Sequence, residues 1–252
     1  MPQTRRQEQI LELIQQQGFA TTEQLVDHFQ VTPQTIRRDL NELARQNRVR
    51  RHHGGAGIDS STVNTAYQAR KIMELDAKER IASALVDMIP DNASLFINIG
   101  TTTETIARAL LVKNNLRVVT NNLHVASILS AREDFTIIIA GGEVRNRDGG
   151  IVGEATRDFI NQFRMDFGII GISGIHSDGS LLDFDYREVR VAQAIINNSS
   201  QVLLAADHTK FGRNAMVRLG NIVQADHVFT DQAPPEEICH LLTEHQVSLH
   251  VV

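Results

Sequence analysis

Residues 31–55 constrain the fold of this chain most strongly, because they are basic in a protein that is acidic elsewhere. The segment reads VTPQTIRRDLNELARQNRVRRHHGG and contains six arginines, two acidic residues and two histidines, whereas the whole chain has a formal net charge of −5. A local excess of positive charge on one short helix and the turn after it is typical of a module that binds a phosphate backbone. The sequence therefore predicts an interaction with nucleic acid.

A helix is predicted to begin at Pro33. Thr32 can accept a backbone hydrogen bond as the N-cap, and proline fits the first helical position, where no N–H donor is needed. Ile36, Leu40 and Leu43 then recur at helical spacing and predict the buried face. The outward-facing residues at this end of the helix are suited to reading base edges or contacting phosphates: Thr32, Gln34, Thr35, Arg37, Arg38 and Asn41.

The surrounding segments predict a winged helix-turn-helix. Thr21 and Gln24 form a capping box that opens a shorter helix, and an earlier apolar helical pattern ends at Gly18. In such a pair the second helix enters the major groove of double-stranded DNA. The basic run that follows, broken by Gly54 and Gly55, suits a β-hairpin wing against the DNA backbone. The predicted wing contacts are Arg48, Arg50, Arg51, His52 and His53.

The alternative for this segment is an arginine-rich, solvated helix in a three-helix subdomain. A lone basic helix would leave that alternative open. Three helices and a wing in the correct order favour DNA binding instead.

Length and composition predict two domains. The 252 residues are 42% hydrophobic and exceed the size of one typical domain. Residues 58–75, which are rich in small and polar side chains, would link a winged helix-turn-helix domain of residues 1–57 to a larger domain of residues 76–252. No apolar run approaches the roughly 18 residues of a membrane span and no N-terminal targeting segment is visible, so a cytoplasmic protein is expected.

Cysteine and histidine usage argues against a metal site and against a disulfide within the chain. Cys239 is the single cysteine and falls in an apolar helical pattern, where a packed thiol is expected. The ten histidines show no HxxxH spacing and no Cys/His cluster. We therefore predict no metal and no cofactor.

The larger domain alternates short β-rich runs with helical segments, which predicts an α/β domain with a mainly parallel sheet. The predicted strands are residues 94–98, 116–120, 136–140, 165–172, 201–207 and 226–230. Ligands of open α/β sheets bind beyond the carboxyl ends of the strands. Gly100 follows the first strand and opens a helix, so backbone N–H groups and threonine hydroxyls can bind an anion there. Lys210 follows a later strand and would add the positive charge that a phosphate needs.

Each of these loops alone is weak evidence. Gly-Thr before a helix is also ordinary capping, and a single lysine after a strand is usually solvated. Their common position at strand ends is the stronger observation.

The motifs resemble one family along nearly the whole chain. TPQTIRRDLNEL followed by RHHGGA resembles the DNA-binding signature of the DeoR family of bacterial transcription repressors. NIGTTTETIA, VVTNNL, AGGEVRNRDGGIVGEAT, GISGIHSDGSL and DHTKFGRNAMV resemble segments of the family's effector domain. The resemblance implies that the larger domain has a fold like that of the ribose-5-phosphate isomerases and binds a phosphorylated sugar or polyol at the strand ends.

The resemblance also implies a set of effector-binding residues. Phosphate would be bound at the start of the helix and by the lysine, and the other residues would shape the rest of the site. The implied residues are Asn98, Gly100, Thr101, Thr102, Thr120, Asn121, Gly141, Gly142 and Lys210. Many family members have an acidic residue at the position of Asn98, which can hydrogen-bond a hydroxyl but cannot carry charge.

The function that the resemblance implies is sequence-specific repression of a carbon-catabolism regulon, with release from operator DNA by a small phosphorylated effector. It suggests a glycerol regulon and glycerol 3-phosphate as the effector. Because one recognition helix reads only a half-site, we also expect a homo-oligomer, either a dimer or a tetramer.

The alternative function is that of a sugar-phosphate isomerase-like enzyme. Isomerisation would need a carboxylate poised as a general base beside the substrate carbon. The segment where the isomerases carry paired acidic residues reads GISG at residues 171–174, and the acidic residues that follow are Asp178, Asp183, Asp185 and Glu188. A shared fold does not imply shared chemistry, so we predict no enzymatic activity and no catalytic residue.

One charged loop stays outside the predicted site. GGEVRNRDGG contains Arg145, Arg147 and Asp148. The loop could cover a bound ligand, or its charges could pair with one another at the surface.

Overall fold

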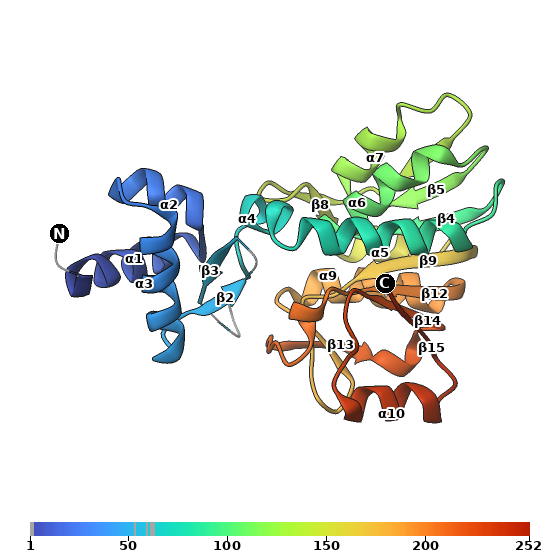
Figure 1. The fold of residues 1–252 in the computed structure, drawn as a ribbon. Helices are drawn as coiled ribbons and strands as arrows, with labels where there is room; N and C mark the ends of the chain where they lie inside the picture. Colours follow the sequence, from blue (N-terminus) through green and yellow to red (C-terminus); the bar gives the residue numbers. More distant parts are fainter. Residues whose placement is uncertain (1–2, 53, 59, 61–63) are drawn as a thin grey trace. The chain divides into compact units, whose positions relative to one another are not determined.

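Capping side chains set the helices of the N-terminal unit. The computed structural model describes residues 3–52, 54–58, 60 and 64–252, and the chain forms two compact units, Met1–Leu75 and Asp76–Val252. The first three helices are α1 (Gln3–Gln17), α2 (Thr22–Phe29) and α3 (Pro33–Arg45), drawn in Figure 1. The hydroxyls of Thr21 and Thr32 accept hydrogen bonds from the backbone N–H groups of Gln24 and Thr35. The predicted starts of α2 and α3 are therefore confirmed.

The apolar face of α3 is buried, as its spacing predicted. Ile36, Leu40 and Leu43 pack with Ile10 of α1 and Leu25 of α2 in one core. Burial of one such side chain stabilises the fold by about 1.5–3 kcal/mol. A three-stranded antiparallel sheet in the order β1-β3-β2 completes the unit. Its strands are β1 (Phe19–Thr21), β2 (Arg50–His52) and β3 (Gly55–Gly57).

The β2–β3 hairpin forms the predicted wing, and it depends on a glycine. Gly55 pairs with Thr21 of β1 and with His52 of β2. A Cβ atom at this position would lie 2.4 Å from the backbone carbonyl oxygen of Ala20. Only glycine lets the hairpin approach β1 this closely.

The predicted linker contains a helix. α4 (Tyr67–Ile72) lies within residues 58–75, contacts β1 and belongs to the N-terminal unit, which ends at Leu75. The predicted bounds of the two domains, residues 1–57 and 76–252, stay predictions.

A buried ion pair fastens α1 to α3. Arg6 Nε lies 2.6 Å from Asp39 Oδ2, and their side chains are 11% and 1% exposed. Gln7 Nε2 also donates to Asp39 Oδ1, at 3.3 Å. The carboxylate is thus on the inner side of α3, and its charge is compensated by α1.

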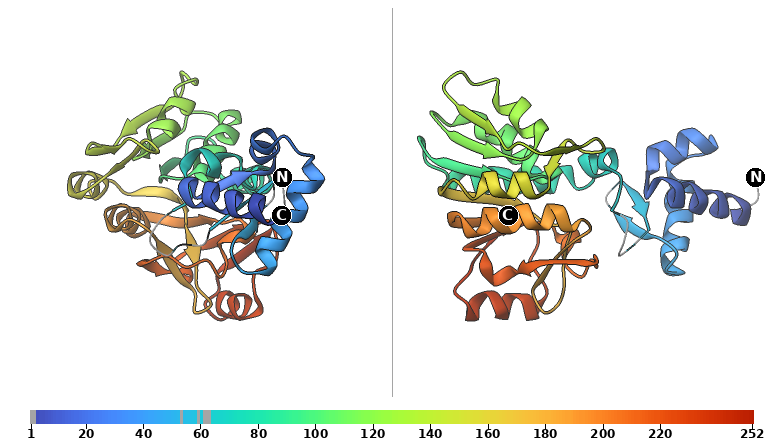
Figure 2. Two further views of the ribbon diagram at one scale, coloured as in Figure 1. Left: turned by 90° about the vertical axis from the view of Figure 1, so that its left-hand side faces the viewer. Right: turned by 180° about the vertical axis from the view of Figure 1, so that it is seen from behind.

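The predicted alternation of strands and helices forms a seven-stranded parallel sheet in the C-terminal unit, in the order β15-β14-β12-β9-β4-β5-β6. The strands are β4 (Ser94–Ile97), β5 (Arg117–Thr120), β6 (Thr136–Ile139), β9 (Met165–Gly171), β12 (Ser199–Ala205), β14 (His227–Thr230) and β15 (Ser248–Val251), and Figure 2 shows them from two further sides. The predicted parallel α/β architecture is confirmed, whereas the edge strand β15 was not among the predicted strands.

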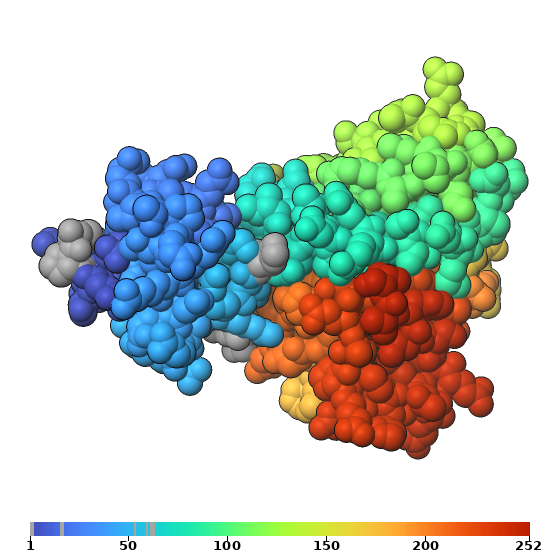
Figure 3. All heavy atoms as spheres, in the orientation of Figure 1, coloured from blue at the N-terminus to red at the C-terminus, as the bar shows by residue number. Residues whose placement is uncertain are grey.

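Helices cover both faces of this sheet. They are α5 (Leu75–Met88), α6 (Thr101–Ala109), α7 (Leu123–Leu129), α8 (Glu154–Ile160), α9 (Tyr186–Asn197) and α10 (Glu236–Glu244). Successive residues of β4 alternate between two cores, with Leu95 and Ile97 packed in one and Phe96 in the other. α5 lies on the face of the unit that is visible in Figure 3. It contributes Ile81 and Leu85 to the core that contains Leu95 and Ile97.

Shorter elements stand beyond the sheet. A hairpin consists of β7 (Glu143–Arg145) and β8 (Gly150–Val152), and an antiparallel sheet consists of β10 (Gly174–Ile175), β11 (Ser180–Asp183) and β13 (Val217–Asn221). The 3-10 helices are η1 (Leu110–Val112), η2 (His208–Lys210) and η3 (Ile222–Gln224). In the part of the chain that the structure describes, no helix has the length and apolar character that crossing a membrane requires.

Replacing Asp39 by Asn should lower the stability of the N-terminal unit by roughly 3 kcal/mol or more, because Arg6 would keep its charge in a mostly buried position without a counter-charge. Amide hydrogen exchange in α1 and α3 measures the change. The matched control is Glu42→Gln, which breaks an ion pair with Arg45, a side chain that is 73% exposed. There we expect a change of less than about 0.5 kcal/mol. Equal exchange rates in Asp39→Asn and wild type would contradict the structural role of the buried pair.

Candidate functional site

The predicted reading face of α3 is exposed and continuous. Its residues line one shallow surface depression, which consists of Thr32, Gln34, Thr35, Arg37, Arg38, Asn41 and Arg45. Arg45 pairs with Glu42 at 2.9 Å. No ion pair joins Arg37 or Arg38 to an acidic side chain within the described residues. Their charges are therefore available to a phosphate backbone.

The wing contributes charge next to α3. Arg51 Nη1 donates a hydrogen bond of 2.8 Å to the backbone oxygen of Gly55, which holds the side chain along the hairpin. Burial and the neighbouring charge of Arg37 lower the pKa of the Arg51 guanidinium. Because an arginine keeps its proton in proteins, the wing and α3 form one positive surface.

The other predicted wing residues differ in exposure. Arg48 is exposed, whereas Arg50 and His52 are half-buried. The ring of His52 packs edge-on against Phe19, with 5.8 Å between the ring centroids. His53 lies outside the described residues.

The predicted effector residues all lie at the edge of the sheet where the parallel strands end. β4, β5, β6 and β12 all run parallel, so the residues that follow them share the carboxyl-end edge. These residues are Asn98, Gly100, Thr101 and Thr102 after β4, Thr120 and Asn121 at the end of β5, Gly141 and Gly142 after β6, and Lys210 after β12.

Two asparagine side chains at this edge have unpaired oxygens. The Oδ1 atoms of Asn98 and Asn121 are buried and have no hydrogen-bond partner within the described residues. Asn121 Nδ2 donates to the backbone oxygen of Ile151 at 3.0 Å. A buried acceptor without a donor costs about 1–3 kcal/mol. The two oxygens are therefore suited to accept hydrogen bonds from ligand hydroxyls or water.

Thr120 is already engaged within the protein. Its hydroxyl donates to the backbone oxygen of Ile97 at 2.7 Å and accepts from the backbone N–H of Asn122 at 3.1 Å. The residue joins β5 to β4 and shapes the edge.

The start of α6 is suited to an anion. Gly100 is the N-cap residue and has no side chain that could accept from the first N–H groups of the helix. Thr103 instead donates its hydroxyl to the backbone oxygens of Asn98 and Gly100, at 2.8 and 2.7 Å. The helix dipole favours negative charge in front of these N–H groups.

One buried carboxylate at the same edge interacts with two lysines. Lys210 Nζ lies 3.4 Å from Asp207 Oδ2, and these side chains are 15% and 1% exposed. Burial alone would raise the pKa of Asp207, but the charge of Lys210, a hydrogen bond from Thr209 and the charge of Lys78 lower it to about 2.

Gly141 and Gly142 serve close packing. A Cβ atom on Gly142 would lie 2.1 Å from Thr156 Oγ1, and that hydroxyl donates to the backbone oxygen of Gly141 at 2.9 Å. Glycine at this point lets the end of β6 approach α8.

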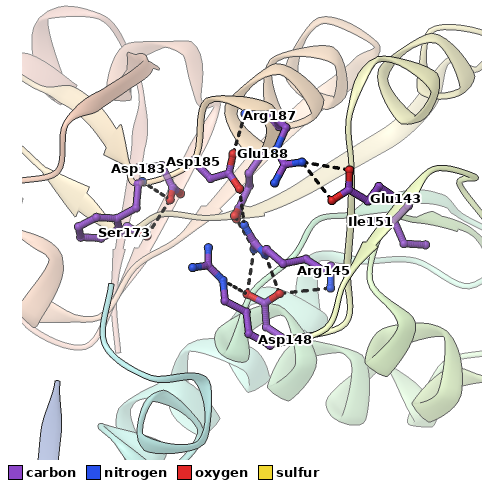
Figure 4. A network of polar contacts seen from close by, with 12 residues as sticks. Glu143, Arg145, Asp148, Ile151, Ser173, Asp183, Asp185, Arg187 and Glu188 are labelled. Atoms are coloured by element: carbon purple, nitrogen blue, oxygen red, sulfur yellow. Dashed lines mark hydrogen bonds and ion pairs between the residues drawn. The ribbon is translucent and has the colours of Figure 1, made fainter. Parts of the chain in front are cut away.

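The β7–β8 hairpin is fixed at the same edge by an arginine with three carboxylates (Figure 4). Arg145 donates two hydrogen bonds of 2.8 Å to Asp148, one of 3.0 Å to Asp185 and one of 2.7 Å to Glu188. Burial would lower the pKa of Arg145, but the charges of Glu188 and Asp148 raise it. The backbone N–H of Ile151 in β8 also donates to the backbone oxygen of Asn121, which follows β5, at 2.7 Å. The hairpin is thus held both by α9 and by the end of β5.

The acidic residues that the isomerase alternative would draw on have partners of their own. Asp183 Oδ1 accepts from Ser173 Oγ at 3.1 Å and from the backbone N–H of Phe184 at 2.6 Å. Asp185 caps α9, and Glu188 contacts Arg145. Asp178 lies in an exposed turn, where a hydrogen bond from the backbone N–H of Ser180 lowers its pKa to about 2.

No metal centre is evident. Within the described residues, no three histidine, cysteine or acidic side chains are placed to hold a metal ion. Cys239 is a half-buried free thiol whose Sγ lies 3.4 Å from the backbone oxygen of Pro234.

Family models match both units. Residues 6–62 match the DeoR-like helix-turn-helix domain, and residues 73–232 match the DeoR C terminal sensor domain. The chain belongs to the DeoR family. The family predicted from the motifs is confirmed, and from here the C-terminal unit is called the sensor domain.

Repressors of this family are similar to the chain over nearly its full length. The glycerol-3-phosphate regulon repressor of Escherichia coli is 59% identical over 251 residues and covers 100% of both chains. The glycerol-3-phosphate regulon repressor of Haemophilus influenzae is 52% identical over 99% of this chain and 97% of its own. This full-length similarity favours the repressor over the isomerase-like enzyme.

A solved structure shares the fold. The translation initiation factor eIF-2B of Pyrococcus horikoshii OT3 has a TM-score of 0.51 over 91% of this chain and 82% of its own, at 15% identity. Ribose 5 phosphate isomerase A of Neisseria gonorrhoeae has a TM-score of 0.40 over 53% of this chain and 52% of its own, at 16% identity.

Sequence reasoning missed Lys78 of the sensor domain. Lys78 is only 2% exposed and lies on α5 one turn before Ile81 and Ala82, which are buried. A lysine on the apolar face of an amphipathic helix was the available signal, because a buried ammonium group needs a counter-charge.

The role of Arg145 was also missed. Its partners Asp185 and Glu188 are 40 and 43 residues away in the sequence, so no local pattern pairs them. The available signal was the spacing of three residues between these two acids at a helix start, which places them on one face.

Replacing Arg145 by Leu should destabilise the sensor domain by about 3–5 kcal/mol at pH 7, because three mostly buried carboxylates would lose their counter-charge. The loss should shrink as the pH falls. In wild type, the folded-state pKa of Asp185 is lowered, so its contribution is present above its unfolded pKa and is lost as the pH falls through the folded value. In the variant, carboxylates without a counter-charge gain stability on protonation. Urea unfolding at pH 7 measures the loss, and unfolding at pH 5, where wild type still keeps the contribution of Asp185, measures how far protonation reduces the loss in the variant.

The control for this experiment is Arg147→Leu. Arg147 lies 3.9 Å from Asp148 but is 58% exposed, so its removal should change stability by less than about 0.5 kcal/mol. A loss of the same size in both variants would contradict the special role of Arg145.

Proposed function

We propose that this chain represses a glycerol 3-phosphate regulon by binding operator DNA and that glycerol 3-phosphate releases it. The observation that carries the proposal is the 59% identity, over the full length of both chains, to the Escherichia coli repressor of that regulon. Two groups of basic residues, one in each unit, support it. They differ in kind: the arginines of α3 are exposed, whereas the lysines of the sensor domain are largely buried.

Operator binding is proposed for α3 and the wing. The exposed residues Gln34, Arg37, Arg38 and Asn41 would lie against the major groove, with Thr32 and Thr35 at the start of the helix. Arg48, Arg50, Arg51, His52 and His53 are proposed to contact the DNA backbone.

The phosphate of the effector would bind between α6 and the two lysines. The first N–H groups of α6, with Gly100, Thr101 and Thr102, would hydrogen-bond phosphate oxygens. Lys210, together with Lys78, would neutralise part of the phosphate charge.

The hydroxyl groups of the effector would reach the asparagines at the strand ends. The buried oxygens of Asn98 and Asn121 lack donors within the described residues and would gain them from the ligand. Thr120, Gly141 and Gly142 would shape this part of the pocket.

Release follows if the effector binds more tightly to a conformation that holds the helix-turn-helix wrongly for DNA. A typical coupling free energy between two such sites is about 1–3 kcal/mol. A dimer or tetramer is part of the proposal, because a symmetric operator offers one half-site for each recognition helix. We place the protein in the cytoplasm, where operator DNA and a phosphorylated metabolite meet.

Replacing Arg37 or Arg38 by Ala should weaken operator binding by about 1–3 kcal/mol if the side chain reads a base. If it contacts a phosphate, the salt dependence of binding should fall instead. Gel shifts at two salt concentrations separate the two roles. Arg45→Ala is the control, because Arg45 lies in the last turn of α3 and pairs with Glu42. Wild-type binding by both single variants and by the double variant would reject the assignment of α3.

Replacing Lys210 by Ala should weaken glycerol 3-phosphate binding about 10- to 100-fold, which is the loss of one charge-assisted hydrogen bond of 1.5–3 kcal/mol. Operator affinity without effector should stay unchanged. Calorimetry measures the first quantity and gel shift the second. Lys78→Met should act in the same direction. The control is Lys113→Ala, because Lys113 precedes β5 at the opposite edge of the sheet.

Normal ligand affinity in Lys210→Ala would reject its role. A wild-type protein that isomerises a sugar phosphate and ignores DNA would establish the enzyme alternative.

A further inference from the structure

A buried carboxylate lies near the middle of the carboxyl-end edge of the central sheet. Asp183 ends β11, and its Oδ1 accepts a hydrogen bond of 3.1 Å from Ser173 Oγ. Ser173 follows the end of β9, and β9 lies in the sheet between β12 and β4. The carboxylate is thus held between the strand that leads to Lys210 and the strand that leads to Asn98.

The carboxylate is fixed in place by its surroundings. The backbone N–H of Phe184 donates to the same Oδ1 atom at 2.6 Å, and Asp183 is only 6% exposed. Arg213 contacts both neighbours of this carboxylate. Its Nη1 donates to the backbone oxygen of Ser173 at 3.1 Å, and its guanidinium lies 5.2 Å from the Phe184 ring centroid. A preorganised acceptor of this kind binds a ligand donor without losing side-chain entropy.

The charges along this edge differ from strand to strand. After β12, Lys210 pairs with Asp207, whose pKa is also lowered by the charge of Lys78 on α5. Beyond β9, Asp183 places a carboxylate at the end of β11, with the guanidinium of Arg213 held against Ser173 and Phe184. An ionised carboxylate only accepts hydrogen bonds, so it attracts hydroxyl donors and repels a phosphate.

A second observation indicates a ligand in this part of the edge. Asn98 on the adjacent strand end is 2% exposed, and its Oδ1 atom has no donor within the described residues. The side chain of Asn98 is neutral, whereas that of Asp183 is a carboxylate.

We propose that Asp183 accepts a hydrogen bond from a hydroxyl group of the effector and thereby selects polyol phosphates over phosphates without hydroxyls. The proposal rests on the proposed function and deepens it. The effector lies with its phosphate at α6 and the lysines and with its hydroxyl groups toward β11. Asp183 is a specificity-determining residue, and the lysines supply affinity for any phosphate.

The test compares Asp183→Asn with wild type in the full-length protein. The amide oxygen of asparagine can keep the bonds from Ser173 and Phe184, so the fold is retained, and urea unfolding and operator binding check this. Calorimetry then measures the binding of glycerol 3-phosphate, of propyl phosphate, which has no hydroxyl group, and of inorganic phosphate.

Wild type should bind glycerol 3-phosphate at least about 10-fold more tightly than propyl phosphate, which corresponds to one charged hydrogen bond. Asp183→Asn should lose most of this preference and bind inorganic phosphate as wild type does. Lys210→Ala should weaken all three ligands alike. Asp178→Asn, at an exposed position in the β10–β11 turn, is the matched control and should behave as wild type.

An unchanged preference in Asp183→Asn overturns the role of Asp183 and leaves the proposed function standing. Equal weakening of inorganic phosphate and glycerol 3-phosphate in this variant also overturns it, because that result marks a structural role. Wild-type protein that binds no glycerol 3-phosphate overturns the proposed function and this inference together.

Discussion

The parallel register of the central sheet is the constraint on which the sensor domain depends. Side chains from five separate loops share one environment only because every strand of the sheet ends at the same edge. Burial then decides what the polar groups there can do. The charges of Lys210 and Lys78 and a hydrogen bond from Thr209 lower the pKa of Asp207, although its burial alone would raise it. Removing either lysine would therefore raise the pKa of Asp207.

The two units handle charge in different ways, and the difference suits their partners. On α3 the arginines project into solvent, where a long polyanion can displace counterions from them. In the sensor domain, Arg145 and Lys210 have carboxylate partners and little exposure. In the proposed effector site, buried polar groups of this kind would distinguish small anions by the positions of their own polar groups.

The sequence was sufficient where the determinants are local. Thr21, Thr32 and Pro33 fix helix starts through contacts of three residues or fewer, and the alternation of apolar runs identified the parallel sheet. It was insufficient where partners are distant. Arg145 contacts acidic residues 40 and 43 positions away in the sequence. Lys78 is buried in α5, whose apolar spacing is that of an ordinary amphipathic helix. The sequence predicted that the strand-end loops lie together. Which acidic side chain pairs with which basic one could be seen only in the structure.

The topology of the sheet also bears on the order of folding. Ser94 on β4 bonds to Asp166 on β9, 72 residues later, so the sheet cannot close until most of the chain has been synthesised. The N-terminal unit needs only its own residues, with Arg6 and Asp39 33 positions apart. Because domains generally fold as units in the order of synthesis, a ribosome-bound chain would hold a finished helix-turn-helix before its sensor exists.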